Sequence, residues 1–278
     1  MAIIQAKDLH FEYPGGIRAL NGVNLSIEKG EGVAIIGRNG SGKTTLVKHM
    51  NGLLKPSQGC MLVNGEPTTD REPAELAPTV GLVFQNPDDQ IFSTKVSDEV
   101  AFGPKNLGYS EAEMRARVEE ALAIVDLQKC KDLHPYDLTI TERKLLCLAS
   151  ILAMKPEVVV LDEPTTAQDQ LGVRQLGAIV MSLLANGITV VTITHDMDFV
   201  AEFFARTVVM RKGEVILDGA TPDVFAEPDL LMTTYVKPSA MAQLAREVGA
   251  DRNAITVTRM VDWVAGQVRP RPGAPTPE

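Results

Sequence analysis

The 278-residue sequence has few cysteines and no excess of basic charge. Its three cysteines, Cys60, Cys130 and Cys147, show no metal-binding spacing and cannot all pair with one another, which predicts a reducing compartment. Lysine and arginine total 27 against 36 aspartate and glutamate residues, a formal net charge of −9. A protein that binds a phosphate backbone usually carries a basic face, so this balance argues against a nucleic-acid partner.

Long apolar runs are also absent. A transmembrane helix needs about eighteen or more apolar residues, and the longest apolar stretch, residues 145–154, is too short. Residues 1–8 lack the basic start and cleavage site of a signal peptide. No internal repeat is visible, which predicts a single unit. The composition, 45% hydrophobic and 23% charged, is typical of a globular protein with one large domain and an extension.

Short apolar runs that alternate with helical periodicity predict an α/β fold. Residues 33–36, 158–161 and 188–193 have the apolar character of strands that are buried on both faces. Between the last two runs, apolar residues at helical spacing cover positions 171–184 and stop at Asn186-Gly187, a good helix terminator. Such alternation predicts a parallel sheet with helices on both faces.

The segments around this core have different patterns. Residues 2–11 and 23–28 alternate apolar and polar positions on either side of a turn signal at 14–16, which predicts an antiparallel β-subdomain at the N-terminus. Residues 86–155 have helical periodicity and little strand character. Within them, the Ser110–Glu113 pair predicts a helix start by a capping box. We interpret residues 86–155 as a helical subdomain inserted into the α/β core.

Residues 221–278 are predicted to form a small C-terminal extension. It contains one expected amphipathic helix, with Met241, Leu244 and Val248 on one face and Gly249 at its end. The tail from about residue 267 is rich in proline and is expected to be disordered.

The segment Gly37-Arg-Asn-Gly-Ser-Gly42-Lys43-Thr44 matches the P-loop pattern, between a buried strand and a helix expected over residues 43–53. Glycine N–H groups and the helix N-terminus can surround phosphates, Lys43 can reach the outer phosphates, and the Thr44 hydroxyl can bind Mg²⁺. The structural alternative is a glycine-rich turn. The predicted ATP-binding residues of this loop are Gly37, Asn39, Gly40, Ser41, Gly42, Lys43, Thr44 and Thr45.

An acidic pair follows the apolar run at 158–161. Asp162 is expected to hold Mg²⁺ through water, and Glu163 to polarise the attacking water as a general base. Alone, such a pair also suits a solvated loop or a helix cap. Its combination with the P-loop favours a catalytic site for ATP hydrolysis.

These motifs stand with Gln85, Asp169 and His195 in the order found in ABC-type ATPases, so residues 2 to about 220 resemble that superfamily. The resemblance implies a RecA-like P-loop NTPase core and an ABC nucleotide-binding domain over residues 1–220. It implies that Gln85 senses and helps to bind Mg²⁺, that Asp169 communicates across a dimer, and that His195 contacts the γ-phosphate. It also implies that Tyr13 stacks on adenine, although this tyrosine could instead pack on the first sheet.

The resemblance is incomplete at the signature motif, which is LSGGQ-type in the superfamily. Here the position is occupied by Leu138-Thr139-Ile140-Thr141-Glu142, which keeps a hydroxyl at Thr139 but has neither glycine. Thr139 and Glu142 also form an expected capping box for a helix over residues 143–155. Thr139 is therefore a candidate nucleotide contact by position rather than by sequence.

Two segments resemble a narrower group, the ATPases of energy-coupling factor importers, which carry vitamins or transition-metal ions such as cobalt and nickel. They are residues 85–92, QNPDDQIF, and residues 99–108, EVAFGPKNLG. The resemblance implies two ATPases at the cytoplasmic face of the membrane, docked on a transmembrane scaffold subunit beside a substrate-binding membrane subunit. It further implies that the extension at 221–278 helps to hold the two ATPases together. The glycine-free signature predicts that the second ATPase is a paralogue rather than a copy of this chain.

The resulting prediction is an ATPase that uses ATP and Mg²⁺ to energise such an importer. One alternative is a non-transport ABC ATPase acting on ribosomes or DNA, disfavoured by the single ATPase unit and the absence of a long coiled-coil insertion. A second is a regulatory subunit with weak turnover, disfavoured by the intact Lys43, Asp162, Glu163 and His195.

Overall fold

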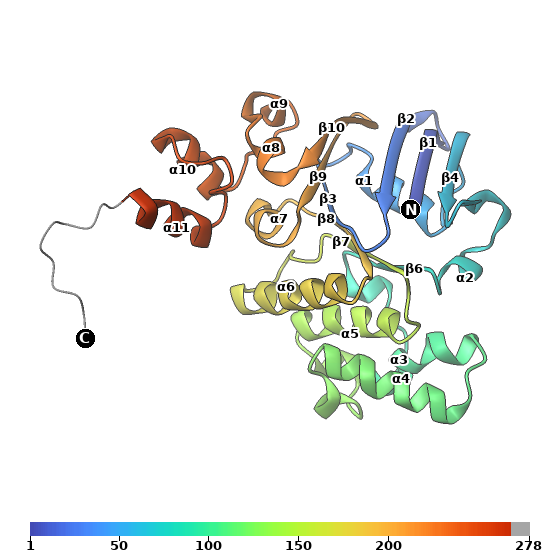
Figure 1. Ribbon diagram of the computed structural model, residues 1–278. Helices are drawn as coiled ribbons and strands as arrows, with labels where there is room; N and C mark the ends of the chain where they lie inside the picture. The colour runs from blue at the N-terminus through green and yellow to red at the C-terminus, as the bar shows by residue number, and fades with distance from the viewer. Residues whose placement is uncertain (268–278) are drawn as a thin grey trace, which may run out of the picture.

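A computed structural model describes residues 1–267 and shows two β-sheets surrounded by helices (Figure 1). The strands are β1 (Ala2–Tyr13), β2 (Ile17–Glu28), β3 (Gly32–Ile36), β4 (Gln58–Val63), β5 (Glu66–Pro67), β6 (Val80–Val83), β7 (Val158–Asp162), β8 (Thr189–Ile193), β9 (Arg206–Arg211) and β10 (Glu214–Ala220). The helices are α1 (Lys43–Met50), α2 (Pro73–Leu76), α3 (Val96–Asn106), α4 (Glu111–Ile124), α5 (Ile140–Leu152), α6 (Gln170–Ala185), α7 (Met197–Phe203), α8 (Thr221–Phe225), α9 (Pro228–Met232), α10 (Ala240–Val248) and α11 (Val257–Gln267).

The larger sheet has the strand order β10-β9-β3-β8-β7-β6. Its central strands run parallel, with Val33 beside Val191 and Val159 beside Val190, and only β10 is antiparallel to its neighbour. Every residue of β7 and β8 is buried, which explains why both strands consist mainly of valine, leucine and isoleucine. The predicted α/β class with a parallel core is therefore confirmed.

The smaller sheet is antiparallel, with the strand order β2-β1-β4-β5. Strands β1 and β2 flank the turn at residues 14–16, and their buried side chains pack with Leu46 and Val47 of α1 in one apolar cluster. The predicted N-terminal antiparallel subdomain is confirmed, and it holds one side of the helix that follows the P-loop.

Residues 86–155 contain helices and turns and no strand. Helices α3, α4 and α5 pack against one another in the lower part of Figure 1, and α6 lies beside α5. The capping boxes expected at Ser110 and Thr139 are both present at the starts of α4 and α5. The helical subdomain predicted in this fold class is therefore confirmed.

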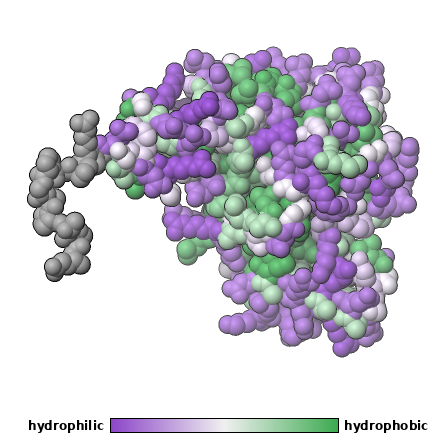
Figure 2. Space-filling view, in the orientation of Figure 1, coloured by the Kyte–Doolittle hydropathy of each residue, from purple (hydrophilic) through white to green (hydrophobic). Residues whose placement is uncertain are grey.

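The expectation of one amphipathic helix in the extension was wrong, because residues 221–267 contain four helices, α8 to α11. Helix α10 ends at Gly249, which has a left-handed φ of 68°, as expected. The second long helix, α11, packs Met260 and Trp263 with Met241 and Ala245 of α10. The predicted disordered tail lies from residue 268 onward outside the described residues. The face of the molecule seen in Figure 2 is mainly hydrophilic, with hydrophobic surface near its middle.

The first part of the predicted extension packs into the main core rather than outside it. Val224, Phe225, Leu231 and Val236 are buried in the cluster that also contains the helical subdomain. The cluster of α10 and α11 is separate and small. Residues 221–236 are thus integral to the main core, whereas α10 and α11 also have a small cluster of their own, and Ala242 and Ile255 connect this part of the chain to the main core.

Candidate active site

The catalytic candidates lie where the parallel strands end. The P-loop follows β3, Gln85 follows β6, the Asp162-Glu163 pair ends β7, and His195 follows β8. The carboxyl ends of parallel strands share one edge, where α/β proteins bind ligands. A cavity of about 380 Å³ opens at this edge. It is lined by residues 39–45, Gln85, Glu163, Thr166 and His195.

Two glycines of the P-loop are required by close backbone contacts. Gly37 has a φ of 147°, and a Cβ atom there would lie 2.3 Å from the carbonyl oxygen of Met210. Gly42 has a φ of 103°, and a Cβ atom would lie 2.5 Å from the carbonyl oxygen of Ala19. Any side chain at either position would displace the loop that precedes α1. The loop therefore places backbone N–H groups and the N-terminus of α1 at the cavity, as phosphate binding requires.

The Lys43 ammonium lies inside the same loop. Its Nζ atom donates to the carbonyl oxygens of Gly37, at 2.7 Å, and Arg38, at 3.2 Å. Burial lowers the pKa of Lys43, and the carboxylates of Glu163 and Asp162 oppose that effect. A buried ammonium that is held only by backbone carbonyls can exchange them for phosphate oxygens, which compensate its charge better.

Asp162 and Thr44 could hold a divalent cation. Burial raises the pKa of Asp162, and the adjacent Thr44 hydroxyl opposes this shift by hydrogen bonding to the carboxyl group. The Oδ1 atom of Asp162 is buried without a hydrogen-bond partner. Within residues 1–267, no group of three or more His, Cys, Asp or Glu side chains could hold a metal by itself. A hydroxyl beside an unsatisfied carboxylate oxygen suits Mg²⁺, which keeps water and nucleotide oxygens as its other ligands.

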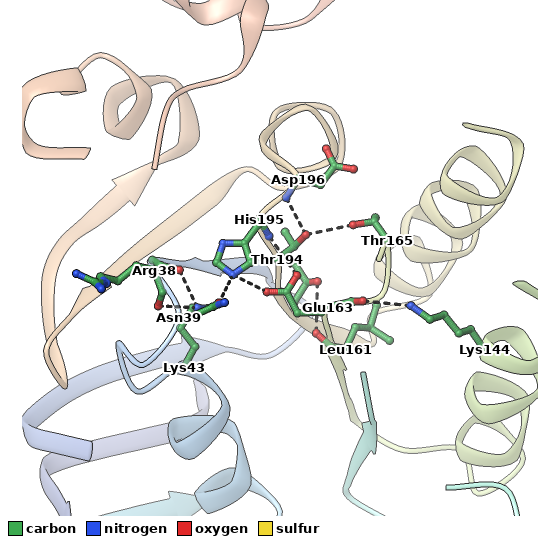
Figure 3. A network of polar contacts seen from close by, with 12 residues as sticks. Arg38, Asn39, Lys43, Lys144, Leu161, Glu163, Thr165, Thr194, His195 and Asp196 are labelled. Carbon is green, nitrogen blue, oxygen red and sulfur yellow. Dashed lines mark hydrogen bonds and ion pairs between the residues drawn. The ribbon is translucent and has the colours of Figure 1, made fainter. Parts of the chain in front are cut away.

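Glu163 and His195 are in direct contact. The Nε2 atom of His195 lies 3.0 Å from Oε1 of Glu163 and 2.9 Å from Oδ1 of Asn39, and its backbone N–H donates to Oε2 of Glu163 at 3.3 Å (Figure 3). Two oxygen neighbours assign the proton to Nε2. Burial and the charge of Lys43 lower the pKa of His195, which favours the neutral ring. Burial raises the pKa of Glu163 to about 6, against the effect of Lys43, which brings it into the range of a general base.

Gln85 lines the cavity, and a second glutamine holds the segment that contains it. The Gln90 side chain accepts a hydrogen bond from the backbone N–H of Phe84, at 3.1 Å, and donates to the carbonyl oxygen of Cys147 in α5, at 3.3 Å. Gln90 thus connects the end of β6 to α5. Sequence reasoning did not assign it a role, and its position within the QNPDDQIF segment was the available signal.

Five predicted site residues do not line the cavity. Gly37 accepts a hydrogen bond from Lys43, and Asp162 precedes Glu163. The other three are Tyr13, Asp169 and Thr139. The Tyr13 hydroxyl lies 3.2 Å from Oγ1 of Thr45, and its ring packs edge-on against Phe11. Asp169 caps α6, accepting a hydrogen bond from the N–H of Gly172 at 2.8 Å. Thr139 caps α5. Their proposed roles in nucleotide binding therefore need either a bound nucleotide or a second subunit.

Two residues at the site were not identified from the sequence. Thr166 lines the cavity, and its carbonyl oxygen accepts a hydrogen bond from Lys144 at 2.5 Å. The sequence feature that could have identified Lys144 is a lysine next to the apolar stripe of a predicted helix. That pattern does not show which groups the ammonium contacts.

Comparison with known proteins relates this site to a family. A family model described as ABC transporter matches residues 20–166, just over half of the 278 residues. The energy-coupling factor transporter ATP-binding protein EcfA of Methanoculleus marisnigri is 44% identical to this chain, and the similarity covers 92% of each of the two proteins. A longer relative from Caldanaerobacter subterraneus subsp. tengcongensis is 43% identical over 93% of this chain, which spans only 45% of that relative's length.

Solved structures show the same relationship. The cbiO1 protein from Clostridium perfringens, part of the ABC transporter complex cbiONQ, has a TM-score of 0.76 and 35% identity, covering 89% of this chain and 99% of that one. A dimeric ATP-binding cassette, MJ0796, in a post-hydrolysis state with ADP and Pi, has a TM-score of 0.71 and 29% identity. The match covers 78% of this chain and 98% of MJ0796. With its P-loop, acidic pair and parallel core, the chain belongs to the ABC transporter family of ATPases.

Proposed function

We propose that the chain is the ATP-hydrolysing subunit of an energy-coupling factor importer for a vitamin or a transition-metal ion. The observation that carries the ATPase function is the convergence of Lys43, Glu163 and His195 on one cavity, with Asp162 beside it. The relatives named EcfA and cbiO1 support the importer class. Within residues 1–267, no helix is both long and apolar enough to cross a membrane.

In the proposed mechanism, the P-loop N–H groups and Lys43 bind the phosphates, and adenine stacks on Tyr13. Thr44, Asp162 and Gln85 would hold Mg²⁺, which neutralises phosphate charge when bound. Glu163 then accepts a proton from the attacking water. His195 is proposed to break its contact with Asn39 and to donate the Nε2–H group to the γ-phosphate. A ring whose lowered pKa favours the neutral form can donate through Nε2 in this way.

A second ATPase subunit is proposed to complete each nucleotide site. Thr139 and Asp169 both lie at helix N-termini outside the cavity, where they can face a partner instead of their own P-loop. The dimeric structure of the MJ0796 cassette supports this arrangement. We propose a paralogue as the partner, because Ile140 and Thr141 replace the glycines of the signature.

The proposal is tested by purifying the complex from native membranes through a tag on this chain. The expected result is one further ATPase together with polytopic membrane proteins, and uptake of a vitamin or metal ion by the reconstituted complex that requires ATP. Copurification of ribosomal RNA or DNA without a membrane protein would instead support the non-transport alternative.

A further inference from the structure

Lys144 is a buried lysine without a carboxylate partner among the described residues. It lies in the second turn of α5, and 8% of it is exposed. Its Nζ atom is 2.5 Å from the carbonyl oxygen of Thr166. It is also 3.4 Å from the carbonyl oxygens of Glu163 and Pro164. In Figure 3, Lys144 reaches from α5 toward the turn that carries Glu163, on the side opposite Lys43 and Asn39.

Burial of an ammonium group is costly unless its donors are used. Leu145, Leu146 and Leu148 follow this position in α5 and are all buried, so an apolar residue would suit the packing. At Lys144, all of the recorded acceptors are backbone carbonyls of a single turn. The lysine therefore serves that turn rather than an ion pair.

The turn after β7 has an unusual backbone. Glu163 has a φ of 47° and Ala167 a φ of 59°, both in the left-handed region that residues other than glycine rarely adopt. Strained conformations of this kind persist only where surrounding contacts determine them, and they gather at active sites. Within the turn, the N–H of Thr166 donates to the carbonyl oxygen of Glu163 at 3.3 Å, and the N–H of Gln168 donates to that of Thr165 at 3.1 Å. Lys144 adds a side-chain donor for the carbonyl oxygens of Glu163, Pro164 and Thr166.

We propose that Lys144 is a positioning residue, which holds the turn from Glu163 to Thr166 so that the Glu163 carboxylate remains against His195 and the attacking water. The inference rests on the proposed role of Glu163 as the general base. Helix α5 begins at Thr139 and accepts the hydrogen bond of Gln90 at the carbonyl of Cys147. Lys144 thus mechanically joins the catalytic turn to the helix that carries the signature position and contacts the segment after β6.

Substitution Lys144→Met keeps the length and the apolar stem but removes the three donors. Displacement of a catalytic group by about 1 Å can cost roughly 100-fold in rate. We expect kcat to fall by about 10- to 100-fold while the dissociation constant for ATP stays within about twofold, because Lys144 does not line the cavity. The matched control is Lys55→Met, since the Lys55 ammonium also donates to backbone carbonyls, those of Thr68 and Arg71, away from the turn. The control is expected to lower stability and to retain kcat per folded molecule.

The decisive test is a double-mutant cycle with Glu163→Gln, using the full chain in its purified complex and radiolabelled phosphate release. If Lys144 acts through Glu163, Lys144→Met has little further effect in the Glu163→Gln background. A normal kcat for Lys144→Met, or a loss of equal factor in both backgrounds, would overturn the inference. Retained hydrolysis by Glu163→Gln alone would instead remove the proposed general base. If Lys144→Met does not fold, Lys144→Gln is judged by the same criteria.

Discussion

The Nε2 atom of His195 lies 3.0 Å from Oε1 of Glu163, although the two residues are 32 positions apart and follow different strands. The contact exists because β7 and β8 are parallel neighbours that end at the same edge of the sheet. It places the proposed general base and the proposed γ-phosphate sensor in one hydrogen-bonded unit. Oδ1 of Asn39 in the P-loop lies 2.9 Å from the same nitrogen of His195 and extends this unit to the phosphate loop.

The buried carboxylate of Glu163 is expected to destabilise the nucleotide-free protein at neutral pH. Its pKa rises from 4.5 to about 6 on folding, so the folded state favours the protonated form, and stability is lost as pH rises through that interval. Glu163→Gln removes the titration. The variant should therefore be more stable than the wild type at pH 8, by at most about 2 kcal/mol because solvent reaches part of the group. At pH 4.5 the difference should be much smaller.

Urea unfolding of the nucleotide-free wild type and Glu163→Gln at the two pH values measures this difference. An equal stability gain for Glu163→Gln at both pH values would contradict the idea that burial of the charged Glu163 carboxylate lowers stability. A wild type that is more stable than the variant at pH 8 would contradict it too.

A row of exposed valines lies along one face of α11. Val257, Val261 and Val264 are spaced at helical intervals and are 65%, 59% and 47% exposed. If the C-terminal helices hold two ATPases together without nucleotide, Val261→Asp should weaken that dimer by about 10-fold or more, because it places a charge in an apolar contact. Sedimentation equilibrium of the nucleotide-free protein with its ATPase partner measures the effect.

Thr258→Asp adds the same charge at an exposed position of α11 outside the valine row and serves as the control. An unchanged dimer in both variants would show that this face has another use. A point substitution is preferable to deletion of residues 221–278, because that deletion would also remove Val224, Phe225 and Leu231 from the main core.

The glycine-free signature predicts unequal nucleotide sites. Thr139, Ile140 and Thr141 begin α5 with good capping, but β-branched residues resist the positive φ and close phosphate approach that glycine allows. Glu142 adds a carboxylate near the same helix start. A misplaced donor costs about 3 kcal/mol, or 100-fold, at an oxyanion-type contact. The site that uses Lys43 and Glu163 of this chain with the partner's signature should therefore perform most of the hydrolysis.

Reconstitution of the complex allows the two sites to be compared. Glu163→Gln in this chain should reduce ATP hydrolysis and transport more than the matching substitution in the partner ATPase. Equal losses, or an active complex with two copies of this chain, would rule out the asymmetry.

Local patterns in the sequence predicted the parts of the fold that depend on local chemistry. The Gly37–Thr44 motif predicted a strand, a phosphate loop and a helix, and the capping boxes at Ser110 and Thr139 predicted two helix starts. Helix α11 was missed, although Val257, Val261 and Val264 have helical spacing, because its start shows no Ser, Asp or Gly signal as clear as Gly249 at the end of α10. The packing of residues 221–236 into the main core was also missed, since it depends on contacts with distant elements.

The features of the site that could not be predicted from the sequence are contacts between segments far apart in the chain. The Arg38 guanidinium lies over the ring of Tyr235, 4.9 Å from its centroid, and no local pattern relates a P-loop arginine to a residue so far along the chain. Lys144 is similar, because its three carbonyl acceptors belong to a turn that follows another strand. Sequence motifs predicted which residues carry the chemistry, and the tertiary contacts indicate which residues hold them in place.

Two substitutions compared side by side show whether Lys43 binds phosphate and Glu163 activates water in one site. Lys43→Ala should weaken ATP binding, since it removes the ammonium from the P-loop. Glu163→Gln should leave binding intact and lower turnover by roughly 10²- to 10⁴-fold, the usual cost of losing a general base. It should also accumulate as an ATP-bound dimer in size-exclusion chromatography. Near-normal hydrolysis by Glu163→Gln, with ATP affinity unchanged, would contradict the account.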